Sequence, residues 1–460
     1  MLRYIGRVFL ILFLAALGYG IWYAIQALPI VSAYGAKNLC SGVWVSGREP
    51  DDVIEQELGT ALSSLGTYTI DTRDSSATGS VWSFFQVKSI YRKGLGCTLV
   101  NERSEAELRD QRFRIAAAPH NDADTIPWPA GDRLTDRIPA GIDAIRLKNV
   151  VESAFAESDP EHPVRTRAVI VVYRDTIIAE RYAAGFDRHT PLCGWSMTKS
   201  ITNAMIGLLV ADGKLDPDAP APVKQWSDDA RRNITLRHLM QASSGLDWTE
   251  DYSGPSDATR MLFRSSDAGK FAVEKKALHP PDTKWVYSSG TTNILSRIIR
   301  ETLGDEQYHR FPYERLFRPV GMNSMVIEPD PDGTFVGSSY SYGSARDWAR
   351  FGLLYLHDGI WQGRRMLPEG WVSFTSTPAR SAPRGEYGAQ WWLNAGAPGN
   401  PQDRTYPDVP EDSFQAEGFE GQYVFVIPSR QLVVVRLGLT QGRDFDANGL
   451  VSGIISSISR

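Results

Sequence analysis

The chain is poor in the residues that build metal sites and disulfide frameworks. Its 460 residues include only 3 cysteines and 7 histidines. The histidines are scattered, without a pair four residues apart and without a neighbouring cysteine cluster. A zinc site needs such clustered nitrogen and sulfur ligands. The sequence therefore predicts no metal site, and no motif in it indicates a cofactor.

An excess of basic residues is also missing. The 49 lysines and arginines stand against 54 aspartates and glutamates, which gives a formal net charge of -5 at pH 7. The chain has no basic stripe interleaved with aromatic residues, a feature typical of nucleic-acid-binding proteins. Nucleic acid is therefore not expected as a partner.

One long apolar run is present at the N-terminus. Val8–Ala27 carries no charged residue and has about the length that a bilayer-spanning helix requires. Arg3 and Arg7 precede it, and this charge placement predicts a cytoplasmic N-terminus with the remainder exported to the periplasm. We predict that residues 1–35 are an uncleaved signal anchor in the inner membrane. A signal peptide cleaved near Gly35 is the alternative, although its apolar region would normally be shorter.

The three cysteines fit an exported protein. Cys40 and Cys97 lie in the N-terminal region and could form a disulfide in an oxidising compartment. Cys193 is predicted to be a small buried apolar residue.

Composition divides the rest of the chain into two parts. Residues 36–139 are interpreted as an N-terminal extension and linker, with short strand-like pieces at 43–45 and 81–87. The stretch 116–139 is rich in proline, aspartate and alanine and lacks periodicity, which is typical of a connecting loop. Residues 140–460 are predicted to form the main domain.

This main domain combines strands at both ends with a largely helical middle. Apolar periodicity predicts helices, and β-branched runs predict two hairpins. The predicted segments are a helix over 142–155, a hairpin of 168–173 with 177–182, helices within 196–316, a hairpin of 422–427 with 432–437, and a final helix over 446–458. Such an order predicts an α+β fold, in which helices flank an antiparallel sheet and a helical subdomain is inserted. It disagrees with a doubly wound α/β-hydrolase, whose Gly-x-Ser-x-Gly elbow the chain also lacks.

Ser196 and Lys199 form the most informative polar pair, at the start of the helical middle. Residues three apart on a helix share one face, with Cβ atoms about 5–6 Å apart. A buried lysine one turn away can take the proton of a serine hydroxyl and make it a nucleophile. Ser196 is predicted as the first residue of a buried helix closed by Gly213, where helix N–H groups favour developing negative charge. Because this spacing also arises by chance in a chain of this length, the surrounding sequence has to support it.

Two further segments carry candidate site residues. Tyr287 precedes an apolar helix, and a phenol beside a cation can take part in acid–base chemistry. The segment 416–422 introduces the C-terminal hairpin, and its glycines permit close approach of the backbone to a ligand. We expect the N–H of Gln422, on a strand edge, to form an oxyanion hole with the N–H of Ser196. An ordinary turn tyrosine and an ordinary loop are the structural alternatives.

These motifs, in this order, resemble those of the serine β-lactamase and penicillin-binding-protein superfamily. The likeness covers about residues 140–460 and is nearest to the class C branch with its esterase and 6-aminohexanoate-dimer hydrolase relatives. It implies the β-lactamase/transpeptidase-like fold, an acyl-enzyme on Ser196, and general acid/base work shared by Lys199 and Tyr287. Further matching phrases lie at 239–246, 344–352 and 387–392.

Two departures from the family pattern bear on the substrate. Ser289 stands where the second motif often has asparagine, and it has less reach toward a substrate amide. Phe419, Glu420 and Gly421 stand where β-lactamases carry Lys-Thr-Gly, so an aromatic ring replaces the cation that meets the antibiotic's carboxylate. We therefore expect an ester or linear amide with a neutral acyl part rather than efficient β-lactamase activity. Further candidates for the pocket wall, for which core packing is the alternative, are Tyr252, Trp391 and Trp392.

The sequence thus predicts a membrane-anchored, exported serine hydrolase that acts through Ser196. Its expected partners are the membrane and a small ester, amide or peptide substrate. Two alternatives stay open. One is a non-catalytic sensor that binds cell-wall peptides on the same fold, and the other is a D,D-peptidase or β-lactamase.

Overall fold

The chain divides into two compact units. The computed structural model describes residues 2–59, 61–111, 113, 115, 123–135, 138–442 and 444–459. The first unit comprises Met1–Arg92, Cys97–Asp110 and Thr249–Ser266; the second comprises Lys93–Gly96, Gln111–Trp248 and Asp267–Arg460.

One long helix and a four-stranded sheet build the first unit. The C-terminal half of helix α1 (Leu2–Trp44) packs against the sheet, whose strand order is β1-β2-β3-β4. Leu39, Cys40, Tyr68 and Ala77 are buried together in the core between them. The other elements are β1 (Gly66–Asp71), β2 (Ser76–Val81), β3 (Phe84–Arg92), β4 (Gly96–Leu99), α2 (Pro50–Glu57), α3 (Glu105–Asp110), α7 (Asp257–Arg264) and the 3-10 turn η1 (Ala61–Leu65).

Helix α1 is long enough and apolar enough to cross a membrane. Its side chains from Tyr4 to Tyr23 are exposed, whereas Ile30 and most of the residues after it are buried against the rest of the unit. A helix of this kind serves as an anchor or as a signal sequence.

The strand predicted at 43–45 is wrong, because α1 continues to Trp44. The ring of Trp44 stacks on that of Tyr91, with centroids 6.3 Å apart. Strand propensity is weak, and packing of this kind overrides it. The piece predicted at 81–87 is the β2–β3 hairpin, with a two-residue turn between the strands. The predicted pair Cys40 and Cys97 forms a disulfide between α1 and β4.

A six-stranded antiparallel sheet forms the centre of the second unit. Its strand order is β12-β13-β14-β15-β5-β6, which brings the two ends of the domain together: β15 pairs with β5. Both predicted hairpins are confirmed as β5–β6 and β14–β15. The strands are β5 (Thr166–Tyr173), β6 (Thr176–Tyr182), β12 (Trp392–Leu393), β13 (Phe414–Gly418), β14 (Gln422–Ile427) and β15 (Leu432–Gly438).

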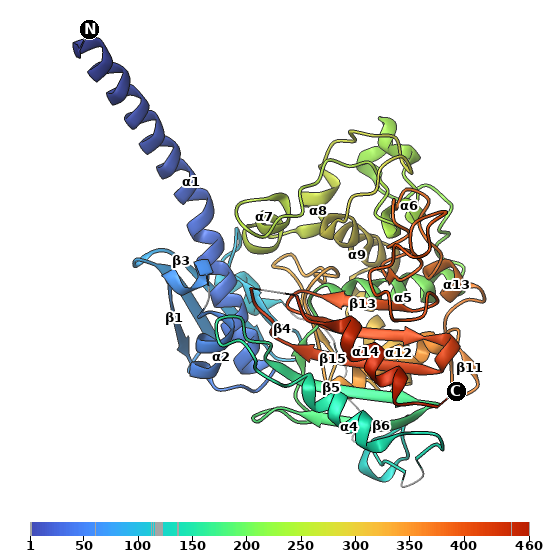
Figure 1. Ribbon diagram of the computed structural model, residues 1–460. Helices are drawn as coiled ribbons and strands as arrows, with labels where there is room; N and C mark the ends of the chain where they lie inside the picture. Colours follow the sequence, from blue (N-terminus) through green and yellow to red (C-terminus); the bar gives the residue numbers. More distant parts are fainter. Residues whose placement is uncertain are drawn as a thin grey trace. The chain divides into compact units, whose positions relative to one another are not determined.

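Helices cover both faces of this sheet. Successive side chains of a strand point to opposite faces, and in β5 and β15 the side chains of both faces are buried. Val169, Val171 and Val434 pack toward α4 (Ala144–Ser153) and α14 (Ala447–Ser456), which Figure 1 shows over the strands. On the other face, α12 (Ala345–Leu356) packs against β5, β14 and β15. The helices predicted at 142–155 and 446–458 are α4 and α14 with shorter ends.

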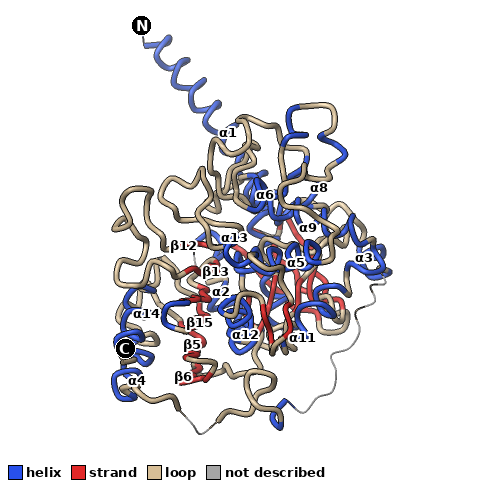
Figure 2. The backbone as a smooth tube through the Cα atoms, turned by 90° about the vertical axis from the view of Figure 1, so that its right-hand side faces the viewer, coloured by secondary structure: helices blue, strands red, loops and turns tan. Residues whose placement is uncertain are grey.

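The helical middle is centred on α5 (Thr198–Ala211) and α9 (Ser289–Leu303), which pack on each other (Figure 2). Of the connecting loop predicted at 116–139, residues 116–122 and 136–137 lie outside the described residues, and 123–135 contain only the turn η2 (Ala123–Thr125). The remaining elements are α6 (Leu236–Met240), α8 (Ala268–Val273), α10 (Asp305–Tyr308), α11 (Arg318–Val320), α13 (Trp371–Thr375), β7 (Leu192–Cys193), β8 (Val326–Ile327), β9 (Ser341–Gly343), β10 (Ile360–Trp361), β11 (Arg364–Arg365) and the single turns η3 (Trp195–Met197), η4 (Lys224–Trp226), η5 (Ala230–Asn233), η6 (Tyr313–Phe317) and η7 (Pro428–Arg430).

Candidate active site

Ser196 lies in the 3-10 turn η3, which leads into α5. The expectation that Ser196 is the first residue of the α-helix needs correction, because the α-helical bonding begins at Thr198. The residue before it, Trp195, has a φ of 46°, a left-handed conformation that is uncommon for a bulky residue. Ser196 itself is half-buried, so its hydroxyl stands at the mouth of a buried helix.

Close packing beneath Gly194 fixes this turn. A methyl group at Gly194 would lie 2.5 Å from the ring of Trp348, so only glycine fits there without rearrangement. The Gly194 N–H donates to the carbonyl oxygen of Ser341 at 2.8 Å. The turn is thereby held against strand β9.

Lys199 is buried, with 2% of its surface exposed, and its ammonium group points at Ser196. The Nζ atom donates to Ser196 Oγ at 3.0 Å, to Ser289 Oγ at 3.0 Å and to the carbonyl oxygen of Ser338 at 3.1 Å. A lysine ammonium has three N–H donors, so these three acceptors match its charged form. The geometry brings together the predicted nucleophile and the predicted base.

The sequence did not point to Ser338, which contributes through its main chain. A carbonyl oxygen leaves no mark in a motif, because every residue carries one. Asn293, one turn into α9, links Ser289 and Ser338 through their other oxygen atoms. Its amide donates to Ser338 Oγ at 3.0 Å and to the carbonyl oxygen of Ser289 at 3.1 Å. The hydroxyl of Ser289, which was predicted as a substrate contact, accepts a hydrogen bond from Lys199 in this structure.

Tyr287 lies beside the Lys199 ammonium group, in the loop that enters α9. The centroid of its ring is 4.9 Å from Lys199 Nζ, a cation–π distance. The ring stacks on Trp392 at 5.1 Å and meets Tyr387 edge-on at 5.8 Å. Tyr287 and the pocket candidate Trp392 thus belong to one aromatic cluster beside the lysine, and the acid/base role expected of Tyr287 stays a prediction.

Strands β13 and β14 both contact the turn that carries Ser196, and β13 contacts it more extensively. A methyl group at Gly418, the last residue of β13, would lie 2.1 Å from the carbonyl oxygen of Gly194. Gln422 begins β14, which lies between β13 and β15, so the expectation that its N–H is on a strand edge is wrong. The Gln422 side chain faces the β15 side, where its amide bonds the main chain of Gly438 in both directions.

Arg436 holds the turn that connects β13 to β14. Its guanidinium is buried and donates to the carbonyl oxygens of Glu420 at 3.1 Å and Gly421 at 2.6 Å. Both of these residues have positive φ, 63° and 82°, which a tight reversal of this kind requires. Arg436 gave no motif signal, because its partners in this turn are again main-chain atoms.

The face of β13 toward Ser196 carries small uncharged residues. Ala416 and Gly418 alternate with Glu417, which points to the opposite face. There Glu417 accepts hydrogen bonds from Tyr406 at 2.7 Å and from Gln415 at 3.0 Å, and burial raises the pKa of its carboxyl above the usual range. No lysine or arginine is present in Phe414–Gly418.

The other predicted pocket residues have different surroundings. Phe419 is 52% exposed and meets the ring of Trp195 edge-on at 5.9 Å, next to the nucleophile. Trp391 is fully buried and packs on aromatic neighbours, so its assignment to the pocket wall is wrong. Tyr252 belongs to the first unit, so its place in the pocket stays a prediction. The rings around Trp391 are Phe351, Tyr355 and Phe414, at 5.8, 4.5 and 5.2 Å.

Cys193 is partly exposed rather than buried, and its thiol lies 3.9 Å from the carbonyl oxygen of Ser339. Among the described residues, no group of three or more histidine, cysteine, aspartate or glutamate side chains is arranged to hold a metal ion.

An antiparallel sheet covered by helices, with a serine and a buried lysine at the entrance of a central helix, defines a class of serine hydrolase built on the fold of β-lactamases and penicillin-binding proteins. A family model described as Beta-lactamase matches residues 151–450. The chain belongs to this family.

Relatives and solved structures agree with this placement. The chain is 25% identical to a 6-aminohexanoate-dimer hydrolase of Paenarthrobacter ureafaciens over 326 residues, which is 64% of this chain and 78% of that protein. A family VIII carboxylesterase has the same fold, with a TM-score of 0.54, 13% identity, and coverage of 71% of this chain and 100% of that chain. A penicillin-binding protein homolog from Caulobacter crescentus gives a TM-score of 0.52 at 15% identity, over 71% of this chain and 100% of that chain.

Proposed function

We propose that this protein is a membrane-anchored serine hydrolase that cleaves an ester or a linear amide through an acyl-enzyme on Ser196. The observation that carries the proposal is the 3.0 Å contact between Lys199 Nζ and Ser196 Oγ, in a site where the lysine is buried. Relatives named as a 6-aminohexanoate-dimer hydrolase and a carboxylesterase support the reaction class.

Lys199 and Tyr287 share the proton in this mechanism. The pair accepts the proton of the Ser196 hydroxyl as its oxygen attacks the substrate carbonyl, and then returns a proton to the leaving alcohol or amine. A water molecule attacks the acyl-enzyme with the same groups in the reverse roles. Nζ lies 4.9 Å from the phenol ring centroid, and we treat Lys199 and Tyr287 as a pair without assigning the first proton to one of them.

The oxyanion of the tetrahedral intermediate needs two N–H donors close to Ser196. We assign one to Ser196 and the other to Phe419, the residue that follows Gly418 on the strand adjoining the turn. This replaces Gln422 as the second donor, because Gly418, which precedes Phe419, packs against the Gly194 carbonyl oxygen.

The substrate is one whose acyl part carries no carboxylate. The face of β13 next to Ser196 presents Ala416 and Gly418, and neither can form an ion pair with an anionic group. Phe419 and Trp195 offer an aromatic edge at the same place. A neutral, partly apolar acyl group suits this surface better than a β-lactam antibiotic does.

The apolar helix α1 supports the anchoring and the location. Its exposed part fits a bilayer in length and composition, and Arg3 and Arg7 ahead of the apolar run support a cytoplasmic N-terminus. The hydrolase domain is then periplasmic, where the Cys40–Cys97 disulfide is stable.

The test is hydrolysis of a short-chain nitrophenyl ester by the full chain and by Ser196→Ala. We expect activity to fall by at least about a thousandfold in the variant while circular dichroism is unchanged, since the nucleophile is lost. A fluorophosphonate probe should add its mass to Ser196 of the native chain alone. Unchanged turnover in the variant would disprove the proposal.

A further inference from the structure

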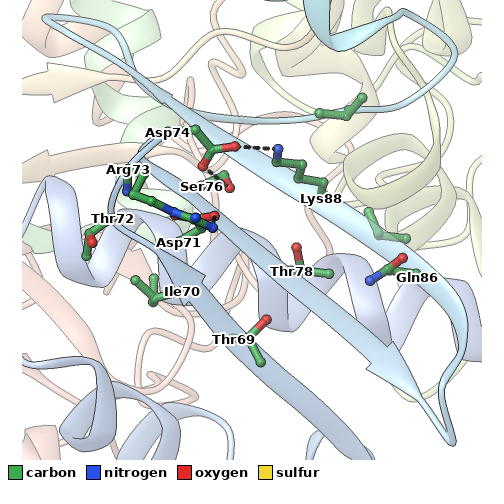
Figure 3. Close-up of a pocket in the computed structure, with 12 residues that line it drawn as sticks. Thr69, Ile70, Asp71, Thr72, Arg73, Asp74, Ser76, Thr78, Gln86 and Lys88 are labelled. Atoms are coloured by element: carbon green, nitrogen blue, oxygen red, sulfur yellow. Dashed lines mark hydrogen bonds and ion pairs between the residues drawn. The ribbon is translucent and has the colours of Figure 1, made fainter.

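The four-stranded sheet of the first unit has a charged end and an uncharged end. Four charged side chains, Asp71, Arg73, Asp74 and Lys88, line a polar depression near the β1–β2 turn, where Lys88 Nζ bonds Asp74 at 2.7 Å (Figure 3). By contrast, the segments 58–70 and 75–87, which run to the other end, contain no charged residue. The two ends therefore suit different surroundings.

The uncharged end exposes large apolar side chains. Trp82 is 66% exposed and Phe84 is 69% exposed, at the tip of the β2–β3 hairpin. Leu62 and Leu65, in the η1 turn, are also exposed. They lie at the same end, because Leu65 directly precedes Gly66, which pairs with Val81 at the hairpin tip. A soluble domain rarely clusters such residues without a partner surface.

The turn at this hairpin tip has positive φ angles, which are unfavourable for the tryptophan and serine that it contains. Val81 pairs with Phe84, so Trp82 and Ser83 form a two-residue turn, with φ angles of 51° and 63°. Such turns favour Asn-Gly, because few side chains adopt positive φ without strain. A tryptophan at this position indicates a function for the exposed ring.

The sheet register places this tip at the level where α1 emerges from the unit. Ala77 packs in the core beside Cys40, whereas a methyl group at Gly79 would lie 2.2 Å from the carbonyl oxygen of Ser32. Moving along β2 toward Trp82 therefore means moving along α1 toward its N-terminus. The tip lies beyond the level of Ser32, close to the exposed part of the helix.

The exposed part of α1 has aromatic residues at both ends. Tyr19, Trp22 and Tyr23 cluster near the sheet, and Tyr4 lies at the far end. The uncharged segment Val8–Ala27, which follows Arg7, rises about 29 Å, close to the thickness of the hydrocarbon core. Aromatic side chains prefer the two membrane–water interfaces. The outer interface then falls near Tyr23–Ala27, close to the level of the hairpin tip.

We propose that the hairpin tip at Trp82–Phe84, together with Leu62 and Leu65, dips into the lipid headgroup region and forms a second membrane contact beside α1. The occupant of this surface is the bilayer that α1 spans, so the inference rests on the proposed anchoring. Two contacts fix the orientation of the first unit on the membrane, which a single helix cannot do. Its charged end, at Asp71 and Arg73, then faces the periplasm.

The test uses the full chain in phosphatidylcholine–phosphatidylglycerol proteoliposomes. In a Cys193→Ala background, an environment-sensitive fluorophore is attached at Phe84→Cys or, as the matched control, at Arg73→Cys, whose native side chain is 89% exposed at the opposite end of the sheet. Nitroxide lipids labelled near the headgroup should quench the probe at position 84 at least about twofold more than the probe at position 73.

Each outcome decides a separate question. Equal, weak quenching at both positions, in protein that resists alkaline carbonate extraction, overturns the second contact and leaves the anchor intact. A blue-shifted but unquenched probe at position 84 means that protein covers the tip, and also overturns the proposal. Release of the whole chain by carbonate overturns the anchoring itself, and with it this inference. The Ser196 probe reaction is independent of all three.

Discussion

Replacing Ser289 by alanine tests whether the contacts of Lys199 set the pH dependence of the reaction. The change removes an acceptor 3.0 Å from the buried ammonium group. A hydrogen bond to a charged group contributes about 1.5–3 kcal/mol, and 1.36 kcal/mol corresponds to one pH unit. Because the acceptor stabilises the protonated lysine, its loss favours the deprotonated, basic form. We expect the acidic limb of kcat/KM to move to lower pH by about 1–2 units.

The assay is the pH profile of nitrophenyl ester hydrolysis, measured for three variants. Ser289→Asn keeps an acceptor at the position and should move the limb less than Ser289→Ala does. Ser288→Ala is the matched control: Ser288 caps α9 through the Thr291 N–H at 3.1 Å, so its loss costs about 1 kcal/mol of stability without a shift of the limb. A profile of Ser289→Ala that superimposes on that of the native chain would refute the reasoning.

Four further predictions concern other parts of the structure. Gly418→Ala places a methyl group against the turn that carries Ser196 and should lower kcat/KM at least about tenfold with the fold retained. An unchanged rate would contradict the assignment of the oxyanion site to this end of β13. Arg436→Lys loses bonds to the connecting turn, so both kcat and the thermal midpoint should fall, and a change in stability alone would deny it a positioning role. The Asp175 carboxylate, 2.6 Å from the ring of His357, raises the pKa of that histidine, so Asp175→Asn should destabilise by less than about 1 kcal/mol below pH 6.5. This difference should vanish as pH rises through the raised pKa, because the native state then releases the extra proton; a constant difference in denaturant midpoint across pH 5–9 would contradict it. Cys97→Ser opens a loop of 57 residues and should destabilise the first unit by about 4 kcal/mol, measured as faster proteolysis, with no further effect of reductant.

The sequence was sufficient for the parts of the fold that depend on local pattern. Alternating and β-branched runs located both hairpins of the second unit, and helical periodicity located α4, α5, α9 and α14. Val43 and Trp44 were misassigned because a short apolar piece fits a strand and a buried helix equally well. The packing of Trp44 on Tyr91 decides between them, and that contact is not local.

For the candidate site too, the sequence was sufficient only for features that a local motif reveals. Side chains with distinctive chemistry, Ser196, Lys199 and Tyr287, could be found from spacing and order. The Ser338 carbonyl and the support of Arg436 could not, because both act through main-chain atoms. Trp391 was misplaced because an aromatic residue suits a pocket wall and a core equally.

The sequence by itself located the candidate nucleophile, the neighbouring lysine, the long apolar N-terminal segment and the α+β class, since each follows from residue type and periodicity. Only the tertiary structure decided which strand adjoins the nucleophile. The segment 416–422 has glycines at Gly418 and Gly421, and either could end the strand next to Ser196. Folding placed Gly418, the last residue of β13, against the Gly194 carbonyl oxygen, because strand order is set by hydrogen bonds between segments far apart in the chain. The same kind of long-range packing placed β2 and β3, the strands of the exposed hairpin, beside the apolar helix α1. In the sequence, α2, η1 and β1 lie between them.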